Sequence, residues 1–378
     1  MNGALRDPGE RPAPGDVVTA SAPIRICDVG GWTDTWFSRR GKVFNIAVSP
    51  RVDVRVRVRS VGTVPHRITL DVANFGDVYG FEPGQAPNRH PLLEAVIDDA
   101  GIPEDLGLEI LVASDVPAGC STGTSASVAV ALIGALDALT PQPRNLDEVA
   151  RAAHRIEVEQ LGLQSGVQDQ LCAAFGDINF IEIDPYPRAT RTRVTPRLLV
   201  RRELERRLLL VHLGGAHRSS EVHERVIAHL VSAGEDSAEL EELRGCAVMA
   251  RDAVEAGDFE GLGRAMTRNT DAQRRLPGEL VSAQAQAVID LAVGHGASGW
   301  KINGAGGDGG SVSILCGPEP ERRRELERAL LAADPTVQLI PIRLSQDGLW
   351  VRRSGVALTP PAASKSRGGP RRPRPGVP

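Results

Sequence analysis

The sequence has few of the residues that mark secreted, zinc-binding or membrane-embedded proteins. Its five cysteines are scattered without a C-x-x-C pair, which argues against a disulfide framework and a zinc site. No apolar run is long and charge-free enough to cross a bilayer, and the opening MNGALRDPGERPAPGD has no signal-peptide core. The net charge of −4 gives no general reason to expect a nucleic acid or an anionic membrane as partner. We therefore expect a cytoplasmic protein with buried thiols.

The two common nucleotide-binding signatures are also missing. The P-loop pattern G-x-x-x-x-G-K-[ST] is absent, which excludes a P-loop enzyme. Residues 304–309 do match G-x-G-x-x-G, but the strand-like SVSILCG follows them where a dinucleotide-binding unit needs a helix. Lysine is scarce and arginine abundant, yet Lys301 stands at the head of this glycine loop. The loop is expected to connect two strands, either close to a ligand or as a flexible hairpin.

A chain of 378 residues is long enough for two domains. Residues 1–18 and 359–378 are rich in Pro, Gly and charge and are predicted to be disordered tails. A Pro- and Arg-rich stretch at 186–202 is the candidate boundary between units 19–195 and 196–358. Because strands and helices mix without regular βαβ alternation, the predicted class is α+β.

Several segments have clear periodicity. Residues 44–60 alternate apolar and polar residues, which predicts a half-buried strand with arginines on its solvent face. Helices are expected at 90–102 and 124–139, and another begins at Asn145 with a capping box to Glu148. Glu157 lies on the flank of that helix's apolar stripe, where it is either a rim residue or a functional carboxylate.

Two further segments suggest a site for an anion. VPAGCSTGTSAS (116–127) joins a strand to an apolar helix, so it is either a capped turn or an anion-binding helix start. In APIRICDVGGWTDTWF (22–37), Arg25 lies within an apolar strand and needs an acidic partner. An embedded arginine, the embedded carboxylates Glu157 and Asp169 and two glycine loops are the parts that phosphoryl transfer needs.

In this order, the segments resemble the motifs of the GHMP kinases over roughly residues 18–352. APIRICDVGGWTDT is similar to the first motif in its fucokinase and heptose 7-phosphate kinase form. VPAGCSTGTSAS resembles the second motif, P-x-x-x-G-L-G-S-S-A, and KINGAGGDGG the third, K-x-x-G-A-G-x-G-G. GVQDQLCAAFGDINFIE resembles the aspartate segment of sugar 1-kinases. The implied fold has an N-terminal ribosomal-protein-S5-domain-2-like domain, a C-terminal ferredoxin-like α/β domain and a cleft between them.

The resemblance implies an ATP- and Mg²⁺-dependent kinase that phosphorylates a sugar, or sugar phosphate, at the anomeric C1 hydroxyl. Asp169 would face the attacking hydroxyl with Arg25 beside it, and Glu157, Thr124 and Ser125 would bind Mg²⁺. The ATP phosphates would contact Pro117, Gly119, Ser121, Thr122, Gly123, Thr124, Ser125 and Ala126. The substrate would contact Asp34, Gly30, Gly31, Trp32, Gly304, Gly306, Gly307 and Lys301.

The sequence departs from the family pattern in both nucleotide loops. Ser121-Thr122 replaces the usual Gly-Leu, and Asp308 adds negative charge where Gly or an aromatic is usual. Trp32 and Gly31 replace the histidine and glutamate of galactokinase proper, which favours a 6-deoxy sugar or another sugar face over galactose. Residues 218–220 (Arg-Ser-Ser) either bind a substrate phosphate or begin a capped helix.

Other functions stay open at this point. A homoserine- or mevalonate-type kinase would share the fold, and a catalytically weak sugar sensor would fit the altered loops. A nucleic-acid module has only the arginine-faced strand and the basic tail in its favour, so no nucleic-acid or membrane partner is expected. The expected partner is a small sugar, and the expected assembly is a monomer or a homodimer.

Overall fold

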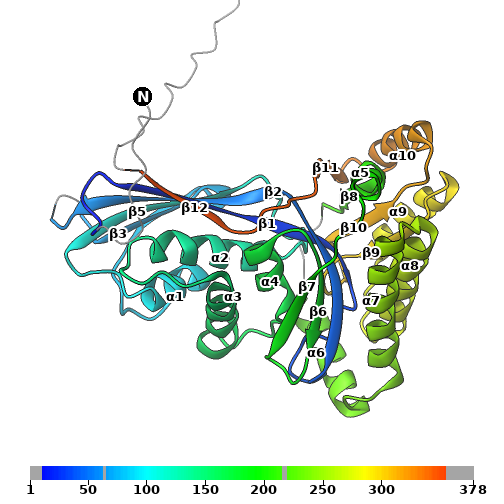
Figure 1. Cartoon of the computed structure of the whole chain (residues 1–378), viewed down its shortest axis with the longest axis horizontal. Coiled ribbons are helices and arrows are strands. Elements are labelled where there is room, and N and C mark those ends of the chain that lie inside the picture. Colours follow the sequence, from blue (N-terminus) through cyan, green and yellow to red (C-terminus); the bar gives the residue numbers. More distant parts are fainter. Residues whose placement is uncertain (1–10, 63–64, 215–218, 355–378) are drawn as a thin grey trace, which may run out of the picture.

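The computed structural model describes residues 11–62, 65–214 and 219–354, without the side chains of 219–222. Two sheets form its framework (Figure 1). The larger has the order β12-β1-β2-β5-β3-β4, with β6 paired to β2 and β7 to β6. Its strands are β1 (Val17–Val29), β2 (Gly41–Ser60), β3 (Ile68–Val72), β4 (Asp77–Phe81), β5 (Leu106–Ser114), β6 (Ile178–Ile183), β7 (Ala189–Arg193) and β12 (Trp350–Ser354). The smaller, of order β11-β8-β10-β9, contains β8 (Leu208–His212), β9 (Gly299–Ile302), β10 (Ser311–Leu315) and β11 (Gln338–Ile340).

The long strand β2 joins the two halves of the larger sheet. Its first part pairs with β6 and its second with β5, while β1 runs antiparallel along both parts. The predicted alternation is confirmed: the valines at 52, 54, 56 and 58 are all fully buried, and the arginines between them lie on the more exposed face. The half-buried strand therefore follows directly from its period-two pattern.

Helices cover one face of the larger sheet (Figure 1). They are α1 (Pro91–Asp99), α2 (Thr124–Asp137), α3 (Leu146–Arg155) and α4 (Gln168–Phe175), and a short 3-10 turn, η1, spans Ala73–Phe75. α2 is apolar on nearly every side because it packs against the sheet and the other three helices. The predicted capping box at the start of α3 is confirmed, with Asn145 and Glu148 each accepting the other's backbone N–H.

α3 continues into a π-helical turn, η2 (Ile156–Gln160), which the sequence pattern does not reveal. Leu161 donates its N–H to the carbonyl of Ile156, so one extra residue is accommodated within the turn. Glu157 follows Ala150 and Ala153 at helical spacing on the buried face of α3, and only 4% of the residue is exposed. Glu157 is therefore not a rim residue.

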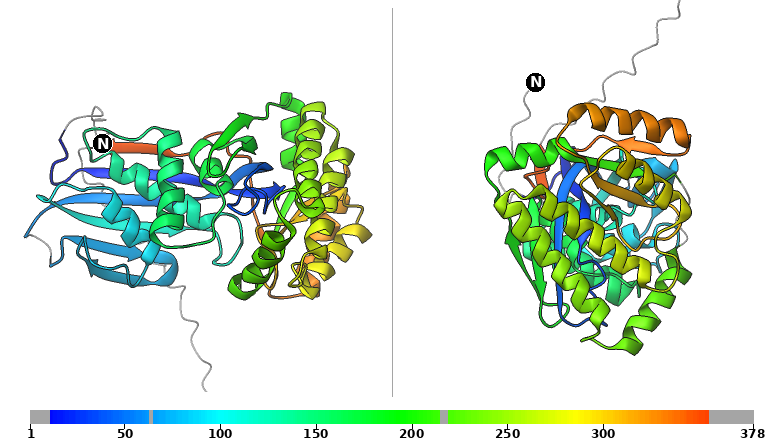
Figure 2. Two further views of the ribbon diagram at one scale, coloured as in Figure 1. Left: turned by 90° about the horizontal axis from the view of Figure 1, so that it is seen from below. Right: turned by 90° about the vertical axis from the view of Figure 1, so that its right-hand side faces the viewer.

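The second half builds a helical layer around the smaller sheet. It contains α5 (Leu198–Arg207), α6 (Ser219–Ala233), α7 (Ala238–Ala256), α8 (Phe259–Arg275), α9 (Ala283–Gly294) and α10 (Pro320–Ala333). α7 and α8 lie side by side, α7 against β2 and α8 against β9 (Figure 2). One apolar core spans the junction, with Phe44 from β2, Leu210 from β8 and Met266 from α8 in the same cluster. The segments of the site meet at this junction.

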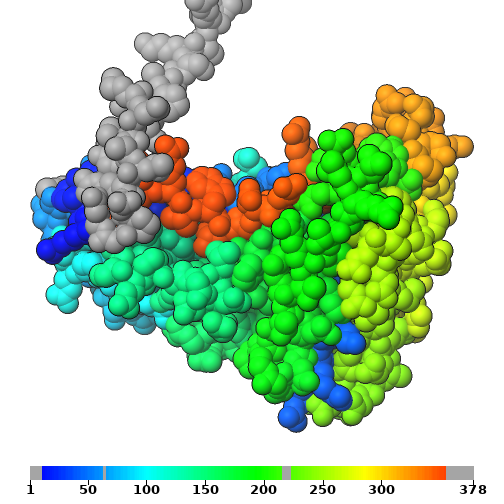
Figure 3. Space-filling view, viewed as in Figure 1, coloured from blue at the N-terminus to red at the C-terminus, as the bar shows by residue number. Residues whose placement is uncertain are grey.

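The chain returns to the larger sheet near its C-terminal end. The orange-red segment crosses the surface from the second half to the first (Figure 3), and β12 pairs antiparallel with β1. Arg353 of β12 forms a buried ion pair with Asp16 at 2.7 Å. The division at 195/196 stays a prediction, but the last strand of the predicted unit 196–358 lies in the sheet of the first unit.

Helices and strands are thus mixed in two sheet-centred halves, as the predicted α+β class requires, and the predicted strand–loop–strand at 299–315 is confirmed by β9 and β10. In the described part of the chain, no helix combines the length and apolarity needed to cross a membrane. All five cysteines are buried and unpaired, as expected.

The capping box gives a test of local stability. We expect Asn145→Ala to lower the free energy of unfolding by about 1 kcal/mol, because the backbone N–H of Glu148 loses its side-chain acceptor at the start of α3. Asn145→Ser, which can still cap, should lose less. Urea unfolding of both variants measures this, and an Asn145→Ala variant as stable as the parent would show that the cap contributes nothing.

Candidate active site

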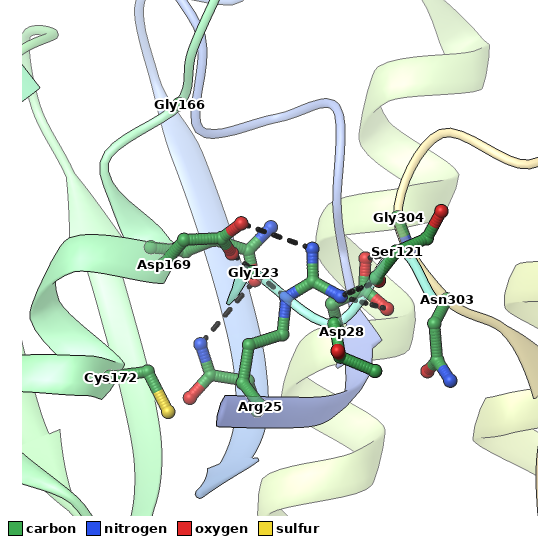
Figure 4. A network of polar contacts seen from close by, with 12 residues as sticks. Arg25, Asp28, Ser121, Gly123, Gly166, Asp169, Cys172, Asn303 and Gly304 are labelled. Atoms are coloured by element: carbon green, nitrogen blue, oxygen red, sulfur yellow. Dashed lines mark hydrogen bonds and ion pairs between the residues drawn. The ribbon is translucent and has the colours of Figure 1, made fainter. Parts of the chain in front are cut away.

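A buried ion pair between Arg25 and Asp169 lies at the centre of the candidate site (Figure 4). Arg25 lies on β1 and Asp169 in the first turn of α4. The guanidinium contacts both carboxylate oxygens, Nε to Oδ1 at 2.8 Å and Nη2 to Oδ2 at 3.2 Å. Burial alone would lower the pKa of Arg25, but Asp169 and then Asp28 outweigh it and raise this pKa. The arginine that the sequence places in an apolar strand therefore has its acidic partner.

The loop before α2 reaches the same arginine. Arg25 donates from Nη1 to the carbonyl of Ser121 at 2.6 Å, and its backbone N–H bonds the carbonyl of Thr122 at 3.0 Å. Gly123 precedes the helix with a φ of 69°, and a Cβ there would lie 3.0 Å from the Asp169 carboxylate. Glycine is needed for both reasons, the left-handed backbone and the close approach.

α2 begins with exposed donors. No side chain caps it, and among the described residues no acceptor pairs with the N–H groups of Thr124, Ser125 and Ala126. The Thr124 hydroxyl lies 3.3 Å from that of Thr122, and Ser125 is exposed. Unpaired N–H groups and the positive end of the helix dipole together make this a place for an anion.

The third glycine loop packs against the second. A Cβ on Gly304 would lie 3.1 Å from Ser121 Cβ, and one on Gly310 would lie 3.1 Å from Ser121 Oγ. Ser311 donates to the carbonyl of Cys120 at 2.6 Å. Asp28 of β1 accepts the Gly304 N–H at 2.9 Å, so all three sequence motifs meet.

Several residues predicted to contact the substrate instead contact other parts of the protein. Lys301 is fully buried, with its amine 3.3 Å from Asp28 Oδ1 and 3.1 Å from Gln273 Oε1, so direct contact with a substrate is wrong for this residue. Burial lowers the pKa of Lys301, and Asp28 opposes the shift. The lysine is connected to the site through Asp28 and through Gln273, which donates to the Gly304 carbonyl.

Three predicted substrate glycines also face the protein. Gly30 donates to Asn269 at 2.7 Å, and a Cβ on it would lie 2.1 Å from the Lys42 carbonyl. Gly307 donates to the Leu280 carbonyl at 2.9 Å, and a Cβ on Gly306 would lie 2.3 Å from that carbonyl. These glycines shape turns and do not line the pocket. In the loop 116–127, named the phosphate loop after its predicted role, Thr122 and Ala126 have buried side chains, so only their backbone N–H groups can bind a phosphate.

A pocket of about 150 Å³ opens beside the Arg25–Asp169 pair. The predicted residues Arg25, Gly31, Trp32, Asp34, Asp169 and Gly304 line it. The other lining residues were not predicted as site residues: Asp28, Thr35, Trp36, Phe37, Gln164, Ser165, Gly166, Gln168, His223, Ile227 and Ala305. His223 packs edge-on against Trp32 with the ring centroids 4.9 Å apart. Most of these residues lie inside the motifs quoted from the sequence, whereas Gln164, Ser165, His223 and Ile227 come from a loop and a helix that only tertiary packing brings here.

Asp34 is the second acid of this pocket. Its side chain accepts the Gln168 N–H at 3.2 Å, and the close approach of Gly166 leaves no room for a Cβ there. Burial, and next the charge of Asp169, raise the pKa of Asp34 to about 7. Asp34 therefore changes protonation near neutral pH.

A second pocket, of about 340 Å³, lies on the other side of the phosphate loop. Pro117, Gly119, Thr124 and Ser125 form one wall, as predicted for nucleotide contacts. The remaining walls are largely apolar and were missed: Val72, Phe75, Pro91, Leu92, Leu93, Val112, Val116 and Val128 are among them. An apolar pocket that opens at an unpaired helix start suits a base joined to phosphates.

Glu157 is the candidate metal ligand. Ser165 Oγ and Gln170 Nε2 donate to its Oε2 at 2.6 and 2.7 Å, whereas its buried Oε1 has no partner in the described structure. Burial raises its pKa to about 7, and nearby Asp169 raises it too, against the hydrogen bonds from Ser165 and Gln170. A buried carboxylate oxygen without a donor fits a hard cation such as Mg²⁺.

The described residues contain no group of three or more His, Cys, Asp and Glu side chains able to hold a metal by themselves. Mg²⁺ in kinases is usually held by one or two carboxylates together with substrate phosphates, so a single protein carboxylate does not exclude it. Its binding by Glu157, Thr124 and Ser125 stays a prediction. Asp308 is exposed on its loop, and Arg218 and the side chains of Ser219 and Ser220 lie outside the described residues.

Comparison with known families decides the identity. The GHMP kinases N terminal domain model matches residues 91–177, which include the phosphate loop, Glu157 and Asp169. The GHMP kinases C terminal model matches residues 250–335, which include the third loop. The chain belongs to the GHMP kinases.

Among curated relatives, this GHMP kinase is 26% identical to D-glycero-alpha-D-manno-heptose 7-phosphate kinase of Campylobacter jejuni, over 60% of this chain and 65% of that one. It is 23% identical to L-fucokinase/L-fucose-1-P guanylyltransferase of Bacteroides fragilis, over 89% of this chain. The chain thus spans 65% and 39% of the lengths of these two relatives.

Two further similarities bear on substrate and fold. Mevalonate kinase of Pyrococcus abyssi is 26% identical, over 89% of this chain and 98% of its own length. The structure of a D-glycero-D-manno-heptose 1-phosphate kinase from Bacteroides thetaiotaomicron superposes with a TM-score of 0.69 at 22% identity, covering 88% of this chain and 98% of the other. That superposition shows the shared fold.

The raised pKa of Asp34 gives a test with a defined sign. The folded protein binds this proton more tightly than the ordinary value of 3.8 allows, so the stabilisation is complete below pH 4 and is lost as the pH rises through about 7. We expect Asp34→Asn to match the parent near pH 4 and to be more stable at pH 8, by a few kcal/mol at most. Urea unfolding of the ligand-free protein across this range measures it.

Asn keeps an acceptor for the Gln168 N–H, so the variant removes charge and little else. Glu157 contributes equally to the pH dependence of the free energy of unfolding in the parent and in Asp34→Asn. If the free energies of unfolding of the parent and of Asp34→Asn differ by the same amount at every pH between 4 and 8, Asp34 does not titrate near neutrality.

Proposed function

We propose that this GHMP kinase transfers the γ-phosphate of ATP to the anomeric C1 hydroxyl of a sugar. The observation that carries the proposal is the position of Asp169. It lies in the wall of the 150 Å³ pocket and beside Gly123 at the start of α2, where an added Cβ would lie 3.0 Å from its carboxylate. A hydroxyl bound in the pocket and a phosphate bound at the helix would therefore meet at this carboxylate.

Different groups of the chain would bind the adenosine, the phosphates, the metal ion and the sugar. The apolar pocket behind Thr124 and Ser125 would take the adenosine, and the first N–H groups of α2 would take the phosphates. Glu157 Oε1 with the Thr124 and Ser125 hydroxyls would hold Mg²⁺, which supplies charge neutralisation on the phosphates. Asp34 would accept hydrogen bonds from sugar hydroxyls.

Asp169 acts mainly by orientation. Arg25 contacts both of its oxygens, yet the side chain keeps a quarter of its surface exposed toward the pocket. The carboxylate can accept a hydrogen bond from a bound hydroxyl and direct its oxygen at the phosphorus. Since phosphoryl transfer passes through a loose transition state, positioning and electrostatics carry more of the rate than proton abstraction.

The pocket fits a polyhydroxylated substrate that has one apolar face. Trp32, Trp36 and Phe37 supply aromatic surface, and Asp28, Asp34 and Asp169 supply acceptors. The indole N–H of Trp32 is buried without an acceptor among the described residues, so a ligand oxygen can take it. These features support a sugar such as a 6-deoxyhexose or a heptose.

A mevalonate-type substrate is the second candidate, because the Pyrococcus abyssi relative matches along nearly its whole length. A weak sugar sensor is supported by Ser121, which replaces the usual glycine and stands at a φ of 56°. A non-glycine residue there stiffens the loop in a conformation that glycine adopts without cost.

A substrate panel separates these functions. We expect ATP consumption with one of L-fucose, arabinose, galactose, mannose or a heptose phosphate, and none with mevalonate or homoserine. The product's phosphorus–proton coupling by NMR identifies the C1 ester. Turnover of mevalonate alone would overturn the sugar proposal, and saturable sugar binding with no turnover on any substrate would favour the sensor.

Asp169→Asn tests the catalytic arrangement. We expect kcat to fall by about two to four decades with nearly unchanged sugar binding, because the amide keeps the shape but loses the charge that orients the hydroxyl. Asp252→Asn, an exposed site on α7, is the matched control and should retain full activity. Thermal unfolding reports whether Arg25 without its partner disturbs the fold. An unchanged kcat would remove Asp169 from the mechanism.

A further inference from the structure

The carboxylate of Glu157 is held asymmetrically. Two neutral donors, Ser165 Oγ at 2.6 Å and Gln170 Nε2 at 2.7 Å, both bind Oε2. They also contact each other, Nε2 to Oγ at 3.1 Å, so the three groups form a closed triangle. The other oxygen, Oε1, is buried without a hydrogen bond in the described structure. A carboxylate held by one oxygen in this way cannot turn freely about its last bond.

Gln170 contributes through its place beside Asp169. Consecutive residues of a helix point about 100° apart, so Asp169 faces Arg25 while Gln170 faces Glu157 from the same turn of α4. Its amide must present nitrogen to Glu157, since the flipped amide would place two acceptor oxygens against each other. The remaining Gln170 Oε1 is buried and likewise has no donor.

Ser165 is fixed from behind by a separate contact. Its backbone carbonyl accepts the hydroxyl of Tyr186 at 3.1 Å, and this hydroxyl also lies 2.7 Å from His154 Nε2. His154 belongs to α3, the helix that leads into the π turn carrying Glu157. The loop bearing the donor and the turn bearing the acceptor are therefore tied together on the side away from the sugar pocket.

We propose that Ser165 and Gln170 are positioning residues that hold Glu157 by Oε2 so that Oε1 is presented to the magnesium ion. This inference rests on the proposed metal role of Glu157 and goes beyond it. The two donors select which oxygen of this buried carboxylate is left for the cation. Groups that orient a ligand without touching the metal typically change metal affinity by about 10–100-fold.

The test measures metal binding directly. Mn²⁺ replaces Mg²⁺ as a paramagnetic probe, and loss of the free Mn²⁺ signal in EPR gives its Kd with the protein and the non-hydrolysable analogue AMP-PNP. We expect Ser165→Ala and Gln170→Leu each to weaken Mn²⁺ binding by about 10–100-fold. Ser165→Thr, which keeps the hydroxyl, should restore most of the affinity.

Two controls isolate positioning from general damage. Gln160→Leu lies on the same π turn but contacts Asp99, so its Mn²⁺ affinity should equal the parent's. Binding of a fluorescent ADP analogue in EDTA should be unchanged in Ser165→Ala and Gln170→Leu. If that binding weakens as much as Mn²⁺ binding does, the two residues are merely structural and the proposal is overturned.

Glu157→Gln separates this proposal from the proposed function. If Glu157→Gln loses Mn²⁺ affinity while Ser165→Ala and Gln170→Leu keep it, positioning is overturned and the metal role of Glu157 stands. If Glu157→Gln binds Mn²⁺ as the parent does, Glu157 is not the ligand, and the metal assignment falls together with the positioning that rests on it.

Discussion

The site depends on one buried cation, the guanidinium of Arg25. A charge in the middle of an apolar strand costs several kcal/mol unless it is paired and hydrogen-bonded, so its partners must be fixed in place. Asp169 from α4 and the carbonyl of Ser121 from the phosphate loop meet this need directly. Asp28 lies 3.8 Å away and in turn holds Lys301 and the Gly304 N–H. The need to pair the buried Arg25 guanidinium thus brings all three glycine motifs together.

The same region has more acidic side chains than basic ones. Asp28, Asp34, Glu157 and Asp169 gather here, and the charge of Asp169 acts on both Asp34 and Glu157. Arg25 and Lys301 are the cations that face these acids among the described residues of the site. Burial and mutual repulsion move two of these acids, Asp34 and Glu157, to a pKa of about 7. Such a site favours a bound cation, which explains why a carboxylate oxygen can remain without a donor.

The two pockets show how a shared fold leaves room for substrate choice. The phosphate loop and α2 separate them, so in the proposed function nucleotide and sugar would be bound by different elements. Backbone N–H groups and glycines would bind the phosphate, and these depend little on side-chain identity. Trp32, Trp36, Phe37 and His223 line the pocket proposed for the acceptor, where a change of side chain would alter the substrate and leave the framework intact.

The sequence by itself determined the local elements and the phosphate loop. Period-two valines required a half-buried β2, Asn145 and Glu148 required a capped helix, and the small residues of 116–127 required a turn at a helix start, because each depends on neighbours in the chain. It also indicated that Arg25 needed an acid. Tertiary structure alone decided that Lys301 is buried against Asp28, that Ser165 and Gln170 bind one oxygen of Glu157, and that the Tyr186 hydroxyl donates to the Ser165 carbonyl. Those outcomes depend on contacts between residues far apart in the chain, for which no periodicity or spacing carries a signal.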